Sequence, residues 1–336
     1  MSDRITIIGD GAMGTVCGIM LCENGLDVTL WSAFKDTAAE MLQAGENRKF
    51  LPGYRLPENM DVTSDESRAF EGAELIVSAV PTQFIRPVWK RLAEHYVRPV
   101  AICSVAKGIE NDTLLRPSEI LADVLADAGR QVGQLAVLSG PSIAPEIADK
   151  LPATVAVAAT DPELADRIQE YFTRPYFRIY TNPDMIGMEV AGATKNVIAI
   201  AAGILDGLQA GDNAKAALLS RGLAEITRLA LALGARADTL AGLAGVGDLV
   251  TTCISPHGRN RSFGEAVGRG QSVSDTLAAS NSVVEGVATT RSVVQLAANV
   301  GVDMPITRSV YDVLFAGESP TDAIAALMER PPRAES

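Results

Sequence analysis

Cysteine and histidine are scarce in this sequence, with four cysteines and two histidines among 336 residues. The cysteines show neither the paired spacing of a metal site nor a disulfide framework, which suits a reducing compartment. The histidines, His95 and His257, have no obvious catalytic partner in the sequence. We therefore expect no metal site and no histidine-based catalysis. The four cysteines are Cys17, Cys22, Cys103 and Cys253.

Positive charge and long apolar runs are also limited. Lysine and arginine number 29 against 41 acidic residues, for a net charge of -12, so binding to nucleic acid or an anionic membrane is unfavourable. The longest apolar stretches, such as 197–205, are too short to span a bilayer, and no export signal precedes residues 5–8. We expect a soluble cytoplasmic protein without membrane insertion, in which an anionic small molecule needs a local basic pocket.

The first half of the chain alternates β-rich apolar runs with helical patterns. This alternation is typical of βαβ units on a parallel sheet. The fold class is therefore α/β, with a Rossmann-type doubly wound sheet domain over residues 1–185. We expect strands at 5–8, 27–31, 75–80, 100–105, 136–139, 154–158 and 176–180, and a helix over 162–172.

After about residue 184 the sequence becomes rich in alanine, leucine and glycine at helical spacing. This pattern predicts an all-α substrate and catalytic domain over residues 186–330, followed by a flexible tail at 331–336. The expected helices cover 190–208, 216–233, 274–278 and 289–300.

Gly9, Gly11 and Gly14 have the G-x-G-x-x-G spacing, directly after the first strand and before the helical stretch 15–23. The first glycine permits a tight turn, the second lets the backbone approach a pyrophosphate, and the third lets helix and strand pack closely. The helix N-terminus offers unpaired N–H groups to the phosphates. The spacing predicts a dinucleotide-binding turn that includes Ala12 and Met13, with a ligand-free glycine turn as the alternative.

The end of the second strand bears on the choice of dinucleotide. An NAD-selective site normally has a carboxylate there, but the strand is followed by Ser32, and Asp36 comes late. Ser32 and Lys35 are able to accept a 2′-phosphate, which favours NADP over NAD. Lys35 is alternatively an ordinary solvated surface charge.

Eight further sequence blocks follow in order along nearly the whole chain. They are NRKFLPG at 47–53, VPTQ at 80–83, SVAKGIE at 104–110, SGPSIAPE at 139–146, GATKNV at 192–197, GDLV at 247–250, GRNR at 258–261 and VEGV at 284–287. Together with the glycine turn they resemble the bacterial NAD(P)-dependent glycerol-3-phosphate dehydrogenase family. The resemblance implies reversible hydride transfer from NAD(P)H to dihydroxyacetone phosphate, giving sn-glycerol 3-phosphate for glycerophospholipid synthesis, by a homodimer.

Three residues are candidates for the chemistry. Lys195 lies in an apolar helical stretch with no carboxylate at helical spacing, so its amine either reaches a rim or faces a polar cavity. In a cavity, desolvation makes proton exchange with a carbonyl oxygen feasible, and the resemblance implies that Lys195 is the general acid and base. Lys107 follows an expected strand and is implied to contact cofactor and substrate, with an ordinary loop lysine next to Gly108 as the alternative. Asp248 either caps a helix or holds Lys195 or a substrate hydroxyl.

The resemblance also implies the binding residues. Arg259 and Asn260 contact substrate phosphate and cofactor, since a guanidinium and an amide suit a dianion. Ala12, Met13 and Gly258 depart from the family, which often has serine and an aromatic residue in the turn and a serine before the arginine. The remaining substrate contacts are Gly140 and Ser142, and the remaining cofactor contacts are Ala144, Val283 and Glu285. Glu285 is alternatively an ordinary exposed acid.

Two other functions stay open. A related reductase of another small hydroxy acid, of the β-hydroxyacid or ketopantoate type, would share the glycine turn and a lysine. The block at 258–261 suits a phosphate better than a carboxylate. A non-catalytic dinucleotide sensor is the third hypothesis, and the presence of both Lys195 and Asp248 argues against it.

Overall fold

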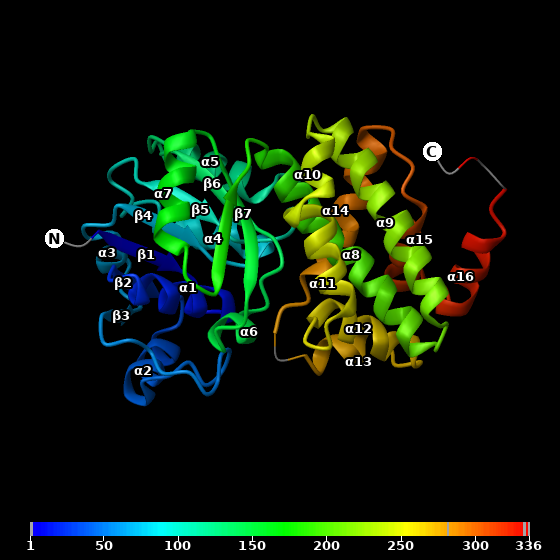
Figure 1. The fold of residues 1–336 in the computed structure, drawn as a ribbon, viewed down its shortest axis with the longest axis horizontal. Coiled ribbons are helices and arrows are strands. Elements are labelled where there is room, and N and C mark those ends of the chain that lie inside the picture. Colours follow the sequence, from blue (N-terminus) through cyan, green and yellow to red (C-terminus); the bar gives the residue numbers. More distant parts are fainter. Residues whose placement is uncertain (1–2, 281, 332–333, 335–336) are drawn as a thin grey trace. The chain divides into compact units, whose positions relative to one another are not determined.

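The computed structural model describes residues 3–280, 282–331 and 334 (Figure 1). The chain divides into two compact units. Unit 1 consists of Met1–Lys107 and Leu115–Glu189, and unit 2 of Gly108–Leu114 and Val190–Ser336. The tail expected at 331–336 lies mostly outside the described residues.

Unit 1 contains one eight-stranded sheet with the order β3-β2-β1-β4-β5-β6-β7-β8. All neighbouring strands are parallel except β6 and β7. The strands expected up to 136–139 are parallel as predicted, and β7, which extends the sheet, runs antiparallel to β6. The connection between β6 and β7, residues 140–152, contains only the five-residue helix α6, which is short for the helix of a parallel crossover. The strands are β1 (Arg4–Ile8), β2 (Asp27–Trp31), β3 (Met60–Thr63), β4 (Leu75–Ser78), β5 (Ala101–Ser104), β6 (Leu135–Ser139), β7 (Ala153–Ala159) and β8 (Phe177–Thr181).

Side chains alternate across each strand, so apolar residues lie on both faces of this sheet, and helices cover both faces. Ile7 and Leu30 belong to the core on one face, whereas Ile8 and Trp31 belong to the core on the other. The strand order reverses at β1, which lies between β2 and β4, and such a switch point is where doubly wound sheets bind ligands. The helices are α1 (Ala12–Glu23), α2 (Lys35–Ala44), α3 (Glu66–Phe70), α4 (Thr82–Leu92), α5 (Pro117–Asp127), α6 (Ala144–Ala148) and α7 (Pro162–Phe172).

The described residues of unit 2 form helices joined by turns and loops, with no strand among them, as the sequence predicts (Figure 1). Helix α8 (Met185–Gly207), which belongs to this unit from Val190 on, is long and apolar enough to cross a membrane, but its most apolar window is completely buried. We interpret α8 as a core helix. The others are α9 (Asp212–Ala232), α10 (Ala237–Ala241), α11 (Asp248–Ile254), α12 (Arg259–Gly268), α13 (Val273–Ala278), α14 (Glu285–Asn299), α15 (Pro305–Tyr311) and α16 (Pro320–Met328), with π-helical turns η1 (Leu243–Gly247) and η2 (Asp312–Ala316).

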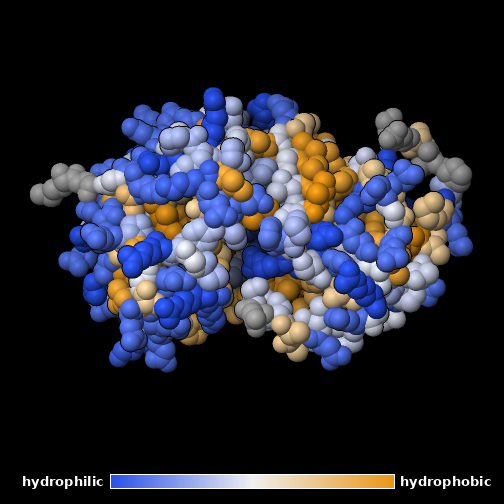
Figure 2. All heavy atoms as spheres, turned by 60° about the horizontal axis from the view of Figure 1, so that its bottom comes forward, coloured by the Kyte–Doolittle hydropathy of each residue, from blue (hydrophilic) through white to orange (hydrophobic). Residues whose placement is uncertain are grey.

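The surface is predominantly hydrophilic on the face shown in Figure 2, with hydrophobic patches between the polar side chains. The four cysteines are all buried. Burial raises the pKa of Cys17 and of Cys253 to about 12. These thiols therefore stay protonated near neutral pH and act as packing residues, since the thiolate is the reactive form.

Glycines let α8 and α12 pack with their backbones in contact. A Cβ at Gly203 of α8 would lie 1.9 Å from the carbonyl oxygen of Arg261. In the same way, a Cβ at Gly264 of α12 would lie 2.1 Å from the carbonyl oxygen of Ile200. This contact matters for the site because α8 carries Lys195 and α12 begins with Arg259 and Asn260.

We predict that Gly264→Ala destabilises the protein by about 1–3 kcal/mol, the usual penalty for overpacking a core. The added methyl group meets the backbone of α8 and not a movable side chain. Ser262→Ala, at an exposed position of the same helix, serves as the control and should leave stability within about 0.5 kcal/mol. Urea unfolding measures both, and equal midpoints for the two variants would contradict the close contact.

Candidate active site

The glycine turn has the geometry that its spacing predicts. Gly9 has φ +114°, and a Cβ there would lie 2.8 Å from the carbonyl oxygen of Ala79. A Cβ at Gly14 would lie 2.0 Å from the carbonyl oxygen of Gly9, whereas one at Gly11 has no atom within 4 Å. Gly9 and Gly14 are therefore required by the turn itself, and Gly11 leaves space beside the backbone for a ligand.

The N-terminus of α1 is suited to a phosphate group. Its N-cap, Gly11, has no side-chain hydrogen bond, and no acidic residue lies in the first turn. The partly buried Ala12 and Met13 form that turn. Unpaired N–H groups and the positive end of the helix dipole thus point to the space beside Gly11.

The side chain of Asn47 holds the glycine turn by hydrogen bonds. Its fully buried side-chain amide donates to the carbonyl oxygen of Asp10 at 2.7 Å and to Oγ1 of Thr15 at 2.8 Å. Asn47 begins the block at 47–53, and its sequence context alone indicates no role for it. Its contribution became visible only when the fold brought residue 47 next to the turn.

Ser32 is turned towards the glycine turn and away from solvent. It is fully buried, and its hydroxyl donates to Oδ2 of Asp10 at 2.7 Å while accepting from the backbone N–H of Phe34 at 3.2 Å. The hydroxyl expected to receive a 2′-phosphate is thus already used. Lys35, the first residue of α2, is exposed.

Unit 1 also brings Lys107, Gly140 and Ser142 together at the ends of β5 and β6. Nζ of Lys107 donates to the carbonyl oxygen of Gly140 at 3.0 Å and to Oγ of Ser142 at 3.2 Å. Gly140 has φ +139°, and a Cβ there would lie 2.9 Å from Cα of Val155. Ala144, buried, begins α6 just beyond. A cation and a hydroxyl thus lie together at the carboxyl edge of the sheet.

Unit 2 contains a buried lysine and aspartate pair. Nζ of Lys195, on α8, lies 2.7 Å from Oδ1 of Asp248 and also donates to Oγ1 of Thr252, both on α11. Lys195 is 5% exposed and Asp248 2% exposed. The expected contact between Asp248 and Lys195 is confirmed, whereas an N-cap role for Asp248 is wrong: Gly247 is the cap and Asp248 is the first helical residue.

Thr252 completes this group, because its hydroxyl also lies 3.3 Å from Oδ1 of Asp248. Thr252 was not predicted as a site residue, although its spacing of four residues from Asp248 places both on one face of a helix. The side chains of Asp248 and Thr252 fix the amine of Lys195 in position, and the carboxylate stabilises its charge. A positioned ammonium is able to donate a proton to a developing alkoxide.

The residues of the block at 258–261 differ in role, some being available to a ligand and one serving packing. Oδ1 of Asn260 accepts from the backbone N–H of Gly286 at 2.9 Å, which orients the amide so that its nitrogen is the end available to a ligand. The exposed Arg259 donates to the carbonyl oxygen of Val283 at 3.1 Å. Arg261 instead pairs with Asp206 at 2.6 Å, so it serves the packing of α12.

The residues around this block lie at helix ends. Gly258 is the N-cap of α12, and Glu285 is the first residue of α14. A Cβ at Gly286 would lie 2.7 Å from Oδ1 of Asn260 and 2.8 Å from the carbonyl oxygen of Asn196. Gly286 therefore lets α14 approach both the residue after Lys195 and the amide of Asn260.

His95 differs from the expectation that it lacks a partner. Its Nε2 lies 3.6 Å from Glu66 and 3.4 Å from Glu94. These three residues form the group of potential metal ligands found among the described residues, but Glu66 is also paired with Arg91, a cation that competes with any metal ion. His257 is exposed in the turn before α12.

We predict different results for alanine at two glycines of the turn. Gly11→Ala should fold normally but bind NADH at least about tenfold more weakly, a loss of about 1.4 kcal/mol, because the methyl group enters the space beside the turn. Gly14→Ala should lower the melting temperature, because its methyl group meets the carbonyl oxygen of Gly9. Thermal unfolding and NADH fluorescence titration separate the two effects. Unchanged NADH affinity in Gly11→Ala would show that the turn does not bind NADH.

Known proteins match this chain along nearly its whole length. Residues 4–165 match the family described as NAD-dependent glycerol-3-phosphate dehydrogenase N-terminus, and residues 184–325 match the corresponding C-terminus. A relative from Chlorobium phaeobacteroides, named glycerol-3-phosphate dehydrogenase [NAD(P)+], is 45% identical over 332 residues, 99% of each chain. One of the same name from Geobacillus kaustophilus is 46% identical over 98% of this chain and 95% of its own.

Solved structures agree with this match. The crystal structure of glycerol-3-phosphate dehydrogenase from Coxiella burnetii has a TM-score of 0.93 and 37% identity, covering 98% of this chain and 99% of its own. A ketopantoate reductase from Ralstonia eutropha, at 16% identity with a TM-score of 0.59 over 96% of this chain and 99% of its own, shares the fold alone. Because both family regions match and relatives of this name are similar over almost the whole chain, the chain belongs to the NAD-dependent glycerol-3-phosphate dehydrogenase family.

Proposed function

We propose that this chain reduces dihydroxyacetone phosphate to sn-glycerol 3-phosphate with NADH or NADPH, and catalyses the reverse reaction. The observation that carries the proposal is the buried amine of Lys195, held by Asp248 at 2.7 Å in a member of this family. A sensor that only bound a dinucleotide would gain nothing from this arrangement, because burying a charged pair is costly.

Unit 1 has the features that a dinucleotide requires. The space beside Gly11 and the uncapped N-terminus of α1 fit a pyrophosphate. When bound, the dinucleotide supplies the hydride. The proposed contacts are Gly9, Gly11, Ala12, Met13, Gly14, Lys35, Lys107, Ala144, Arg259, Val283 and Glu285, with Ser32 acting through Asp10.

Lys195 then acts as the general acid. It donates a proton from Nζ to the ketone oxygen as the carbonyl carbon is reduced, and it takes that proton back in the oxidation of the alcohol. Asp248 and Thr252 position the amine in both directions, so the proton is delivered from a fixed point. Such positioned proton transfer contributes roughly 10²–10⁴-fold to rate.

The phosphate of the substrate requires cations and amide donors in this acidic protein. Arg259 and the amide of Asn260 provide a guanidinium and an N–H₂ group, while Gly258 adds no hydroxyl. In unit 1, Lys107 with Gly140 and Ser142 provides a second group of polar atoms for the substrate. These donors favour a phosphorylated ketone over a simple hydroxy acid.

We propose further assignments on family membership and sequence. Residues 1–185 bind the dinucleotide, and residues 186–330 supply substrate binding and the acid. The enzyme works in the cytoplasm as a homodimer, prefers NADP weakly over NAD, and feeds glycerophospholipid synthesis. The net charge of -12 disfavours nucleic-acid partners and membrane attachment.

We predict that Lys195→Ala lowers kcat for reduction of dihydroxyacetone phosphate by roughly 10²–10⁴-fold, with unchanged NADH affinity. The reason is that the variant removes the proton donor of unit 2 and leaves the glycine turn intact. Stopped-flow absorbance of NADH measures turnover, and fluorescence titration measures binding.

Two variants serve as controls for this test. Lys215→Ala removes another lysine of unit 2 that pairs with an aspartate, Asp206 at 2.6 Å, and should retain normal turnover. Lys195→Met combined with Asp248→Asn leaves no unpaired buried charge and should still be inactive. Near-normal turnover of that double variant would remove Lys195 from the mechanism.

A further inference from the structure

The end of β2 is where a doubly wound sheet distinguishes the two nicotinamide dinucleotides. The adenosine ribose lies there, and a nearby carboxylate reads the 2′-hydroxyl of NAD or a nearby arginine accommodates the 2′-phosphate of NADP. In this chain Trp31 ends the strand and is followed by Ser32 and Ala33. Neither residue is charged, so a charged group must come from another element.

Ser32 does not provide a phosphate ligand in this arrangement. Its buried hydroxyl donates to Asp10 at 2.7 Å and receives the N–H of Phe34 at 3.2 Å. Its single O–H donor, the group that a phosphate would need, is used within the protein. Its function here is to connect the end of β2 to the glycine turn.

Arg91, from the last turn of α4, reaches the same strand end. Its Nη1 donates to the carbonyl oxygen of Ala33 at 3.1 Å, and its guanidinium lies over the ring of Trp31 at 5.2 Å from the centroid. The side chain is 45% exposed, so it is accessible to a ligand. A planar guanidinium held by stacking and by a backbone carbonyl is already oriented to bind an anion.

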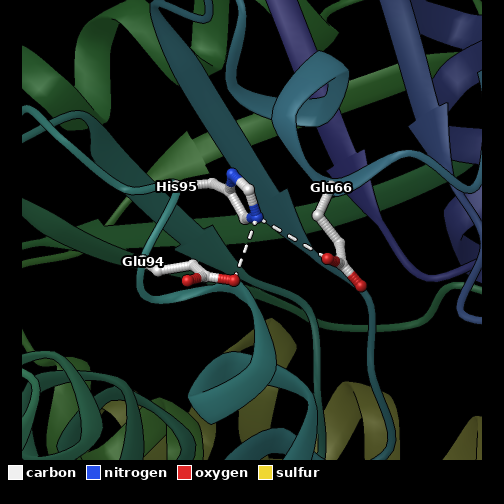
Figure 3. A group of neighbouring side chains, drawn as sticks. All are labelled: Glu66, Glu94 and His95. Atoms are coloured by element: carbon white, nitrogen blue, oxygen red, sulfur yellow. Dashed lines mark ion pairs between the residues drawn. The ribbon is translucent and has the colours of Figure 1, made fainter.

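Glu66, the first residue of α3, restrains this arginine. One carboxylate oxygen accepts from Nε of Arg91, and the other lies 3.6 Å from Nε2 of His95. Figure 3 shows the imidazole of His95 between the carboxylates of Glu66 and Glu94. Among the described residues, Nη2 of Arg91 has no hydrogen-bond partner and remains for a ligand.

We propose that Arg91 is the residue that binds the 2′-phosphate of NADP(H), and that Glu66 limits this preference so that NAD(H) is also accepted. The proposal rests on the proposed use of a dinucleotide by this chain. A 2′-phosphate dianion gains the stacked guanidinium of Arg91, but it is repelled by the carboxylate of Glu66. The 2′-hydroxyl of NAD(H) experiences neither effect strongly.

The test measures binding without turnover. Isothermal titration calorimetry compares 2′,5′-ADP with 5′-AMP, and fluorescence titration compares NADPH with NADH. Arg91→Met retains an apolar stem over Trp31 and should weaken NADPH and 2′,5′-ADP by roughly 10- to 100-fold, the effect of losing a hydrogen bond to a charged group. Affinities for NADH and 5′-AMP should not change.

Glu66→Gln removes the competing charge and should tighten NADPH binding without affecting NADH. Arg68→Ala is the matched control, because Arg68 is an exposed arginine of α3 paired with Asp61 on β3, and it should change neither affinity. High salt should reduce the difference between 2′,5′-ADP and 5′-AMP, since exposed charges are screened.

Three results would overturn the proposal. Equal weakening of NADH and NADPH by Arg91→Met would make Arg91 a structural residue, and loss of NADPH preference in Lys35→Ala alone would assign the phosphate to Lys35. Wild-type protein that binds 2′,5′-ADP no better than 5′-AMP would also contradict it. Absence of turnover with normal adenosine-phosphate binding would count against the proposed reaction and not against Arg91.

Discussion

The ion pair between Lys195 and Asp248 is the interaction on which the proposed chemistry of unit 2 depends. Both side chains are almost completely buried and lie 2.7 Å apart. Removing two charges from water is costly, and a hydrophobic pair of similar volume often gives equal or greater stability. A buried lysine and aspartate are therefore better explained by the need for a positioned proton donor than by stability.

The surrounding helices are arranged so that this amine has a defined place. α8 is the buried core helix, and its contact with α12 is close because Gly203 and Gly264 remove the side chains from between their backbones. The same approach sets the start of α12, where Arg259 and Asn260 lie, and Gly286 allows α14 to join them. The glycines that let these helices pack closely thus also set the positions of the functional side chains.

Much of this could be predicted from the sequence, because strong local signals coincide with the structure. The glycine spacing predicted the turn, and the apolar pattern at 27–31 and the helical pattern at 162–172 match β2 and α7. β3 was missed because it has four residues and includes the exposed Asp61, so it lacks a continuous apolar run. α8 begins at Met185, earlier than expected, because Asp184 accepts the N–H of Gly187.

Contacts between segments far apart in the sequence could not be predicted, because the periodicity of a sequence describes local structure only. The hydroxyl of Ser32 is used by Asp10, Asn47 supports the turn, and Arg91 reaches the end of β2 from a helix some 60 positions later. His95 and Glu66 also meet only in the folded chain. The resemblance implied that Lys195 is the acid, and local spacing showed only that its helical neighbours offer no carboxylate. Its partners Asp248, expected as one of two alternatives, and Thr252 became visible in the structure.

A crystal structure of the chain with oxidised dinucleotide and dihydroxyacetone phosphate tests the central claim most directly, because that complex cannot turn over. The account predicts the ketone oxygen within hydrogen-bond distance of Nζ of Lys195, about 2.6–3.2 Å, with Asp248 still bound to the amine. A ketone oxygen hydrogen-bonded to another side chain or to water, with Lys195 contacting only Asp248 and Thr252, would contradict it.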